Sequence, residues 1–320
     1  LSSFPSPLER CRRLEKALKK SPKIFIKRDD YNSYLCGGNK IRKLEYTLAD
    51  VLDSGATTVI TTGSFQSNHA RITAMAAKRL GLDCYLVLNG DPNQTPSGNF
   101  LIIRKLGIDV ISVKSREERT PIMQDLASEL GKNGEKVYQI PLGASDAVGA
   151  FGMTAGFEEL SLQQKDLGIE FDAVFVSSSS GGTQAGLEMG KFLFQGDKTH
   201  IFGISPDNSK AYIKQKLSSI TSQMMDRLGT GDRLLNEDDF LVETAFIGGG
   251  YGIATPESDE AMTIFSETEG ILLDPVYTSK AAAALIDYCR RGMFSSEDNI
   301  LFWHTGGLVS LFNLNQPQSK

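Results

Sequence analysis

The chain has 320 residues, a length that favours two domains or lobes over a single core. Hydrophobic residues make up 40% of it and charged residues 23%, an ordinary globular composition that argues against disorder. The net charge of −5 gives no broad positive field. We therefore expect neither a nucleic acid nor an anionic membrane surface as a partner.

The cysteines are widely spaced and form no C-x-x-C pair; they are Cys11, Cys36, Cys84 and Cys289. This spacing argues against a structural zinc site or a disulfide framework, and it fits a reducing compartment. No apolar run approaches the ~20 residues that span a bilayer. The first residues also lack the basic-then-apolar order of a secretory signal. The sequence thus predicts a cytoplasmic protein that binds no metal and no membrane.

Short β-branched runs alternate with longer helical patterns along most of the chain. The strands predicted from these runs are, in chain order, residues 24–27, 58–62, 84–88, 110–113, 173–177, 200–204 and 300–304. Helical periodicity lies between them, as in residues 67–80, where Ala70, Thr73, Ala76 and Leu80 share one face. Such alternation predicts an α/β fold of parallel βαβ units, with ligand sites at the carboxyl ends of the strands.

The first candidate site is the glycine pair Gly37 and Gly38, which Asn39 and Lys40 follow. Paired glycines allow a tight turn, and the next residues favour a helix that begins near Lys40. The positive end of that helix and the ammonium of Lys43 would lower the pKa of Lys40. A lysine of this kind can form a Schiff base. The alternative is a plain turn before an exposed helix whose lysines contact water.

The second candidate site, residues 62–69, joins a predicted strand to a predicted helix. Ser67 or Asn68 could cap that helix. The same N–H groups and hydroxyl could also bind a substrate carboxylate. His69 is one of only three histidines, and we interpret it as a hydrogen-bonded structural residue rather than an acid or base.

The third candidate site, residues 177–186, is a serine- and glycine-rich turn between a strand and a helix. Such a turn exposes backbone N–H groups to a phosphate, and the helix dipole adds to the attraction. It matches neither a Walker A loop nor G-x-G-x-x-G. A bare loop is the alternative.

Two further segments lie near the C-terminal end, residues 273–280 and 303–307. Thr278 could cap a helix, and the second segment ends a strand at a glycine pair, where ligand sites of α/β folds usually lie. Tyr277 and Tyr251 could simply be packing residues, the commoner fate of aromatic side chains.

In this order, the motifs resemble the family of 1-aminocyclopropane-1-carboxylate (ACC) deaminases and D-cysteine desulfhydrases. That family depends on pyridoxal 5'-phosphate and has the tryptophan-synthase-β-like fold (fold type II). The likeness runs from residues 27–30 to residues 304–307. It implies two open, twisted, mostly parallel sheets flanked by helices. It also implies a large domain of residues 1–42 and 152–320, a small domain of residues 43–151, and a homodimer.

By this resemblance, Lys40 is the Schiff-base lysine, and Ser67 and Tyr277 complete the catalytic residues. The cofactor would be held by amines, an amide, hydroxyls and backbone groups of Lys40, Lys43, Asn68, Ser180, Gly181, Gly182, Thr183 and Thr305. A small amino-acid substrate would contact Gln66, Ser67, Asn68, His69, Tyr251, Tyr277 and Thr278.

Two residues favour the desulfhydrases. In the family pattern the deaminases carry Glu and Leu where this chain has Thr278 and Thr305. A carboxylate near the pyridine nitrogen keeps it protonated and makes the ring a strong electron sink, whereas a hydroxyl only hydrogen-bonds. Opening a cyclopropane needs the stronger sink. Ser179 and Ser279 also stand where the family often has Gly, which bears on the exact substrate.

We therefore expect β-elimination from D-cysteine to pyruvate, ammonia and hydrogen sulfide. The alternatives within the family are an ACC deaminase or a lyase of another β-substituted amino acid such as L-cysteate. Outside catalysis, the alternative is a protein that binds pyridoxal phosphate or an amino acid without turnover. A nicotinamide-dependent oxidoreductase is disfavoured because the fingerprint loop is missing.

Overall fold

The computed structural model describes residues 1–19, 21–32, 36–194, 198–230 and 235–314. Its strands are β1 (Leu8–Arg10), β2 (Lys23–Arg28), β3 (Thr58–Ser64), β4 (Asp83–Asn89), β5 (Asp109–Val113), β6 (Val137–Gln139), β7 (Ala173–Ser177), β8 (His200–Ile204), β9 (Leu241–Glu243) and β10 (Asn299–His304). Its α-helices are α1 (Arg12–Leu18), α2 (Lys40–Asp53), α3 (Asn68–Leu80), α4 (Gly98–Lys105), α5 (Arg119–Lys132), α6 (Ala147–Leu167), α7 (Gly182–Phe194), α8 (Lys210–Leu228), α9 (Pro256–Glu269) and α10 (Thr278–Arg290). Short 3-10 helices are η1 (Asp29–Tyr31), η2 (Leu142–Ala144), η3 (Glu237–Asp239) and η4 (Leu308–Phe312).

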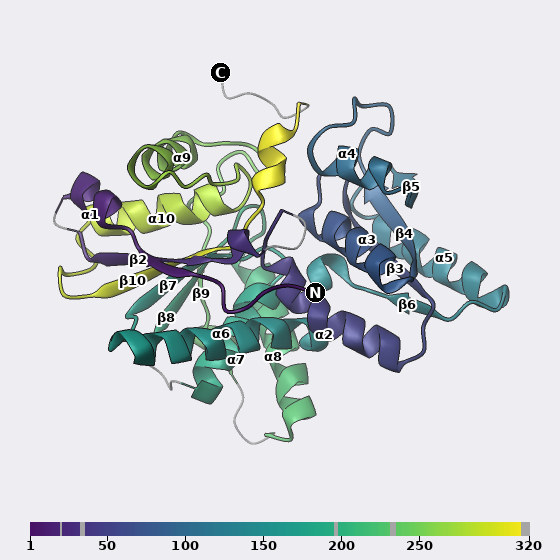
Figure 1. Cartoon of the computed structure of the whole chain (residues 1–320), viewed down its shortest axis with the longest axis horizontal. Coiled ribbons are helices and arrows are strands. Elements are labelled where there is room, and N and C mark those ends of the chain that lie inside the picture. Colours follow the sequence, from purple (N-terminus) through teal and green to yellow (C-terminus); the bar gives the residue numbers. More distant parts are fainter. Residues whose placement is uncertain (20, 33–35, 195–197, 231–234, 315–320) are drawn as a thin grey trace.

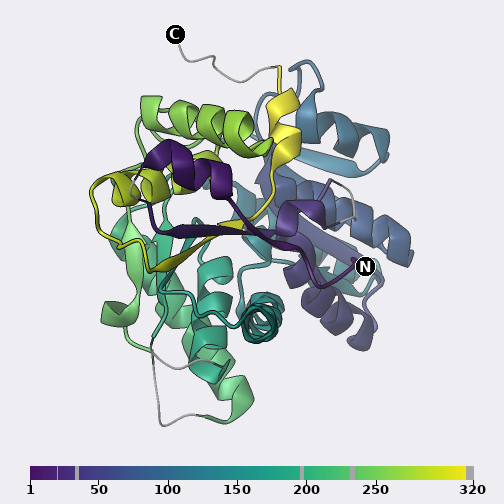
Figure 2. The same ribbon diagram turned by 60° about the vertical axis from the view of Figure 1, so that its left-hand side comes forward.

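The strands form two sheets, which lie on the left and the right of Figure 1. The six-stranded sheet has the order β1-β2-β10-β7-β8-β9, and only β1 runs antiparallel to its neighbour. The four-stranded sheet has the order β5-β4-β3-β6 and is parallel throughout. Figure 2 shows β2, near the N-terminus, beside β10, near the C-terminus. The predicted α/β fold with two mostly parallel sheets is confirmed.

Helices cover both faces of each sheet, because parallel strands are joined by crossovers that lie on the faces. On the six-stranded sheet, α1, α9 and α10 pack on one face, and α6, α7 and α8 lie on the other. On the four-stranded sheet, α2, α3 and α4 pack on one face and α5 on the other. None of the helices in the described part of the chain combines the length and the apolar character that a bilayer span requires.

The predicted strands all appear, within two residues of their predicted bounds. Strands β1, β6 and β9 were not predicted from the sequence; they are three residues long and lie at sheet edges. Three residues give too few alternating positions for a periodic signal, and an edge strand has one neighbour only. The four-stranded sheet lies wholly within residues 43–151. We keep the proposed boundaries of a small domain, 43–151, and a large domain, 1–42 and 152–320, as a proposal.

Helix α2 leads into the four-stranded sheet but packs closely on α6. A Cβ at Gly152 of α6 would lie only 2.0 Å from the carbonyl oxygen of Arg42 and 2.8 Å from the backbone nitrogen of Lys43. The two helices therefore touch backbone to backbone at this point. Any side chain at position 152 would push α2, and the lysines it carries, away from α6.

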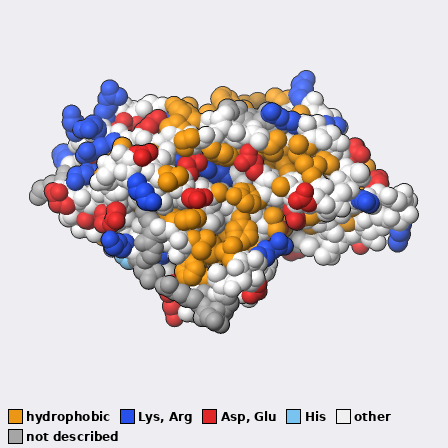
Figure 3. All heavy atoms as spheres, turned by 60° about the horizontal axis from the view of Figure 1, so that its bottom comes forward, with side chains coloured by type: hydrophobic (Ala, Val, Ile, Leu, Met, Phe, Trp, Pro, Cys, Tyr) orange, Lys and Arg blue, Asp and Glu red, His pale blue; other side chains and the backbone are white. Residues whose placement is uncertain are grey.

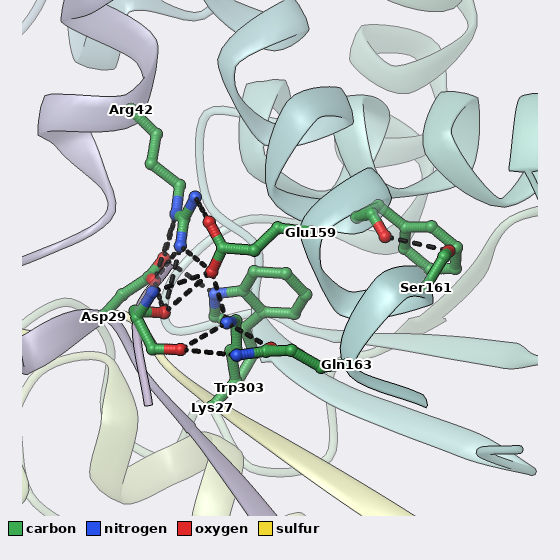
Figure 4. Close-up of polar contacts among 9 residues, drawn as sticks. Lys27, Asp29, Arg42, Glu159, Ser161, Gln163 and Trp303 are labelled. Carbon is green, nitrogen blue, oxygen red and sulfur yellow. Dashed lines mark hydrogen bonds and ion pairs between the residues drawn. The ribbon is translucent and has the colours of Figure 1, made fainter. Parts of the chain in front are cut away.

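A buried network of charges fixes the same end of α2 (Figure 4). The guanidinium of Arg42 donates to Asp29 Oδ1 at 2.8 Å and to Glu159 Oε2 at 3.0 Å. Trp303 Nε1 donates to Asp29 Oδ2 at 2.8 Å, and the ammonium of Lys27 bonds to Glu159. Burial alone would raise the pKa of Asp29, but the charge and hydrogen bonds of Arg42 outweigh it and hold that pKa below its ordinary value. The network joins β2, η1, α2, α6 and β10.

Removing Arg42 should destabilise the protein strongly. Arg42→Met leaves Asp29 and Glu159 without their shared cation, and breaking a buried pair costs about 3–5 kcal/mol. Lys198→Met is the matched control, because it removes a pair with Glu170 in which both side chains are more than 70% exposed. That pair is worth at most about 1 kcal/mol. Urea unfolding measures both free energies, and an equal, small loss for the two variants would contradict the role of the network.

Candidate active site

The carboxyl ends of strands from both sheets open into one cavity of about 380 Å³. Parallel strands end at the same edge of a sheet, which is why residues far apart in sequence meet there. Most of the predicted site residues line this cavity: Lys40, Ser67, Asn68, His69, Ser180, Gly181, Thr183, Tyr251, Tyr277 and Thr305. Four others do not line it and are described below: Lys43, Gln66, Gly182 and Thr278.

Lys40 is the first residue of α2, as predicted, and the preceding glycines explain how the chain enters that helix. Gly37 and Gly38 have φ values of +68° and +112°, which L side chains rarely adopt. A Cβ at Gly37 would also lie 1.9 Å from the carbonyl oxygen of Asp30. The tight turn brings Lys40 to the cavity wall, where its Nζ lies 3.2 Å from Asn39 Oδ1.

Burial lowers the pKa of Lys40 to about 8, against a smaller opposing effect of the Asp274 charge. The direction agrees with the prediction, but the leading cause is burial rather than the charge of Lys43. Desolvation disfavours the ammonium, so a larger share of Lys40 is a neutral, nucleophilic amine near neutral pH.

The pH dependence of this amine can be measured directly. Only the neutral amine reacts with electrophiles, and it forms as pH rises through the pKa. With a pKa of about 8, the modification rate of Lys40 should rise up to about pH 8 and then level off. An ordinary lysine would still be gaining reactivity at about pH 10. Acetylation of the cofactor-free protein, followed by peptide mass spectrometry, measures the rate. The exposed Lys198 serves as an internal reference, and no plateau below about pH 10 would contradict the lowered pKa.

The loop between β7 and α7 has the geometry of an anion site. Gly181 has a φ of +85°, and α7 begins at Gly182, so the N–H groups of the first helical turn face the loop. Ser145 reaches this loop from the segment before α6: its Oγ lies 2.7 Å from Ser180 Oγ and accepts a hydrogen bond of 2.7 Å from Lys43 Nζ. Burial, followed by the charge of Lys40, lowers the pKa of Lys43 well below its ordinary value.

The missing side chain at Gly182 lets Lys43 and Ser145 pack against the start of α7. A Cβ there would lie 2.6 Å from Lys43 Nζ and 2.8 Å from the Cα of Ser145. Neither Lys43 nor Gly182 lines the open cavity, because both lie behind its wall. They still build the cradle, since the amine of Lys43, the hydroxyls of Ser145 and Ser180, and the N-terminus of α7 meet at this point.

Adding a methyl group in the cradle should weaken phosphate binding. We expect Gly182→Ala to reduce the affinity of the cofactor-free protein for pyridoxal phosphate by about tenfold or more, equivalent to at least ~1.4 kcal/mol. Gly131→Ala is the control, because a Cβ on that helix residue meets nothing within 4 Å. An absorbance titration measures both affinities. Equal affinities would show that the phosphate does not occupy this cradle.

The segment after β3 caps α3. Ser67 Oγ accepts a hydrogen bond of 3.1 Å from the N–H of Ala70, which confirms one of the two predicted caps. His69 is buried, and its Nε2 lies 2.8 Å from Thr61 Oγ1. Burial, followed by the charges of Lys40 and Lys43, lowers the pKa of His69 well below its ordinary value, so the imidazole is neutral. These contacts agree with the structural interpretation of this histidine.

Gln66 points away from the cavity. Its Oε1 accepts from the N–H of Asn99 at 3.0 Å, and its Nε2 donates to the carbonyl of Ser97 at 3.1 Å. The side chain thus anchors the start of α4, whereas the family resemblance implied that it contacts the substrate. Asn68, two positions further on, lines the cavity, and its Oδ1 accepts from Asn99 Nδ2 at 2.9 Å.

Two tyrosines from the six-stranded-sheet side close one wall of the cavity. The hydroxyls of Tyr251 and Tyr277 are 2.6 Å apart. Burial, followed by the charge and hydrogen bond of Tyr251, raises the pKa of Tyr277 well above its ordinary value. Burial also raises the pKa of Tyr251, so both phenols are protonated near neutral pH. They provide hydrogen-bonding groups in an otherwise packed wall.

Thr278 does not cap α10, contrary to the prediction. The carboxylate of Asp274 caps it instead, by accepting from the N–H groups of Val276, Tyr277 and Thr278. Thr278 Oγ1 donates to Asp274 Oδ1 at 2.7 Å and accepts from the N–H of Asp274 at the same distance. Its side chain is buried in the helix start rather than exposed in the cavity.

Three residues of the site have roles that the sequence did not reveal. Asn39 Nδ2 donates to Thr183 Oγ1 at 2.8 Å and so joins the start of α2 to the start of α7. Ser145 completes the cradle, and Asp274 supplies a carboxylate beside Lys40. Each acts on a residue more than a hundred positions away, so only the folded chain brings them together.

Known proteins match the chain over most of its length. The family model described as pyridoxal-phosphate dependent enzyme matches residues 1–306. A protein of Pyrococcus horikoshii named "Putative 1-aminocyclopropane-1-carboxylate deaminase" is 38% identical over 91% of this chain and 86% of its own. A D-cysteine desulfhydrase of Klebsiella pneumoniae is 37% identical over 98% of this chain and 94% of its own.

Solved structures agree. A crystal structure of an ACC deaminase homologue superposes with a TM-score of 0.88 at 34% identity, and the match covers 97% of this chain and 91% of that one. A threonine deaminase structure matches with a TM-score of 0.68 at 19% identity, which shows a shared fold alone.

Proposed function

Because the chain belongs to the pyridoxal-phosphate-dependent enzymes, in the family of ACC deaminases and D-cysteine desulfhydrases, we propose that it eliminates hydrogen sulfide from D-cysteine. Its cofactor is pyridoxal 5'-phosphate. The observation that carries the proposal is the placement of Lys40. Its amine, with a pKa lowered to about 8, lines the same cavity as the glycine- and serine-rich loop before α7.

The residues present fit the cofactor. Because Gly182 has no side chain, the Lys43 amine and Ser145 pack directly against the start of α7, where amine, hydroxyl and backbone N–H donors converge as a phosphate group requires. Ser178 Oγ is buried and has no hydrogen-bond partner among the described residues, so a ligand group there would satisfy it. Lys40 Nζ would hold the aldehyde carbon. The phosphate would bind the ammonium of Lys43, the hydroxyls and the N–H groups of the loop, as expected for Ser180, Gly181, Gly182 and Thr183. Asn68 and Thr305 would contact the ring.

The chain's own groups can bind and orient the substrate. The N-terminus of α3, with the hydroxyl of Ser67, would take the substrate carboxylate. Lys40 Nζ would take the proton from the substrate Cα, and the hydroxyls of Tyr251 and Tyr277 would orient the rest of the molecule. Pyridoxal phosphate, when bound, supplies the electron sink that stabilises negative charge at that carbon.

The nature of residue 278 supports β-elimination. Thr278 offers a hydroxyl that Asp274 already engages twice, where a deaminase of the family pattern has a carboxylate. The hydroxyl is buried in the start of α10, so residue 278 would supply no carboxylate to keep a bound pyridine nitrogen protonated, and the ring would be the weaker sink. Loss of a good leaving group such as thiolate needs less charge delocalisation than opening a cyclopropane does. Thr305, which lines the cavity where a deaminase of the family pattern has Leu, also favours the desulfhydrases.

The decisive variant is Lys40→Ala. It should lose the visible absorbance of the bound cofactor, and sulfide release should fall by about a thousandfold or more, because one group both holds the cofactor and moves the proton. Lys16→Ala, on the exposed face of α1, should match the wild type. Full sulfide release from the Lys40 variant would sink the assignment.

A substrate panel tests the substrate. The cofactor-loaded protein is given D-cysteine, L-cysteine, ACC and L-cysteate, and sulfide, 2-oxobutanoate, sulfite and ammonia are measured. We expect the highest kcat/KM for D-cysteine. Higher kcat/KM for ACC, or for L-cysteate, would replace the proposed substrate. A yellow protein that is inert on the whole panel would favour a binding function without turnover.

A homodimer in the cytoplasm remains part of the proposal. Exposed hydrophobic side chains lie on α2, α6 and α7, at Tyr46, Leu52, Leu162, Leu167, Leu193 and Phe194. Figure 3 shows hydrophobic side chains across the middle of the face that the lower helices of Figure 1 form, with charges of both signs around them. A face of this composition suits contact with another protein surface better than contact with a polyanion.

A further inference from the structure

One ion pair crosses the cavity from one sheet to the other. Arg116 lies between β5 and α5, beside the four-stranded sheet, and its Nη1 is 3.1 Å from Asp207 Oδ2. Asp207 follows β8 of the six-stranded sheet. The guanidinium carbon of Arg116 also lies 4.7 Å from the ring centroid of Tyr251. All three residues line the cavity that Lys40 enters.

Two hydrogen bonds fix the carboxylate of Asp207 on the side of the six-stranded sheet. Its Oδ1 accepts from Ser179 Oγ at 2.9 Å and from Asn208 Nδ2 at 2.8 Å, and the side chain is only 7% exposed. Ser179 belongs to the loop that forms the anion cradle. It is also a residue at which this chain departs from the glycine common in the family pattern. A glycine has no hydroxyl to donate, so this anchor depends on the serine.

Lys280 fixes the backbone next to both Asp207 and Tyr251. The buried ammonium of Lys280 donates to the carbonyl of Pro206 at 3.1 Å and to that of Gly250 at 2.9 Å. Asp207 and Tyr251 each follow one of these residues directly. One cation therefore fixes both partners of Arg116 relative to each other. Arg116, in contrast, is 43% exposed and comes from the other sheet.

We propose that Arg116 is a positioning residue that fixes Tyr251 and closes the substrate end of the cavity, through its ion pair with Asp207 and the Ser179 anchor. The planar guanidinium suits both tasks, since its edge pairs with a carboxylate while its face stacks on an aromatic ring. Tyr251 in turn bonds to Tyr277, so the position of Arg116 sets the whole tyrosine wall. A partly exposed pair is weak and opens readily, which lets substrate enter and product leave.

The proposal rests on the proposed function only in taking an amino acid as the substrate. Its test uses the cofactor-loaded wild type and the variants Arg116→Met, Asp207→Asn and Ser179→Gly. Lys114→Met, an exposed residue of the same segment, is the control. One readout is the KM and kcat for D-cysteine. The other is quenching of the bound cofactor's fluorescence by acrylamide, which needs no turnover.

Arg116→Met and Asp207→Asn should each raise KM roughly tenfold with kcat within about twofold, and each should raise the quenching constant several-fold. Ser179→Gly should act in the same direction with a smaller effect. The double variant of Arg116 and Asp207 should be no worse than either single one, because both remove the same contact. Lys114→Met should match the wild type, and the melting temperatures should agree within about 2 °C.

Two results would overturn the proposal. The first is an unchanged quenching constant in Arg116→Met. The second is a loss of kcat, cofactor content and melting temperature together, since that pattern indicates a structural role. A wild type that does not act on D-cysteine would end the proposed function instead, and the quenching comparison would still decide the role of Arg116.

Discussion

The buried contact of Arg42 with Asp29 and Glu159 is the constraint on which the site depends. Arg42 lies on α2 between Lys40 and Lys43, the two lysines that the proposed chemistry needs. Burying this many charges is costly, and an apolar core of the same volume would often be as stable. We infer that the charges are kept for position, because their hydrogen bonds tie α2 to β2, η1, α6 and β10 at once. The placement of α2 in turn sets the position of the Lys40 amine at the cavity wall.

The fold followed from local signals in the sequence because a parallel strand buried on both faces is a short, continuous β-branched run. The bounds of β7, whose residues are all buried, were predicted without error for that reason, and those of β8 were also predicted without error. Capping was predicted where the polar side chain stands directly before the helix, as Ser67 does. It failed at α10, where the capping carboxylate of Asp274 lies four residues before the helix and Thr278 only bonds back to it.

Site residues could be predicted from the sequence only where one short segment contains several of them. The turn before Lys40 and the loop that ends at Thr183 are recognisable because glycine and hydroxyl residues cluster there. Ser145 and the pair of Arg116 with Asp207 have ordinary local sequences, and they gain a role only from neighbours that tertiary packing supplies. The direction of a side chain is equally hidden: Gln66 and Ser67 are adjacent in sequence, yet Gln66 points toward α4 and Ser67 lines the cavity.

The cradle draws its parts from distant stretches of chain. Lys43 comes from the helix that enters the four-stranded sheet, Ser145 from the segment that leaves it, and Ser180 from the six-stranded sheet. An anion held there is a bridge between the two halves of the molecule. By thermodynamic linkage, a ligand that binds only the folded protein raises its free energy of unfolding by RT ln(1 + [L]/Kd). At a free ligand concentration of a hundred times Kd, this is about 2.7 kcal/mol. Cofactor supply would thus govern how long the enzyme survives as well as whether it works.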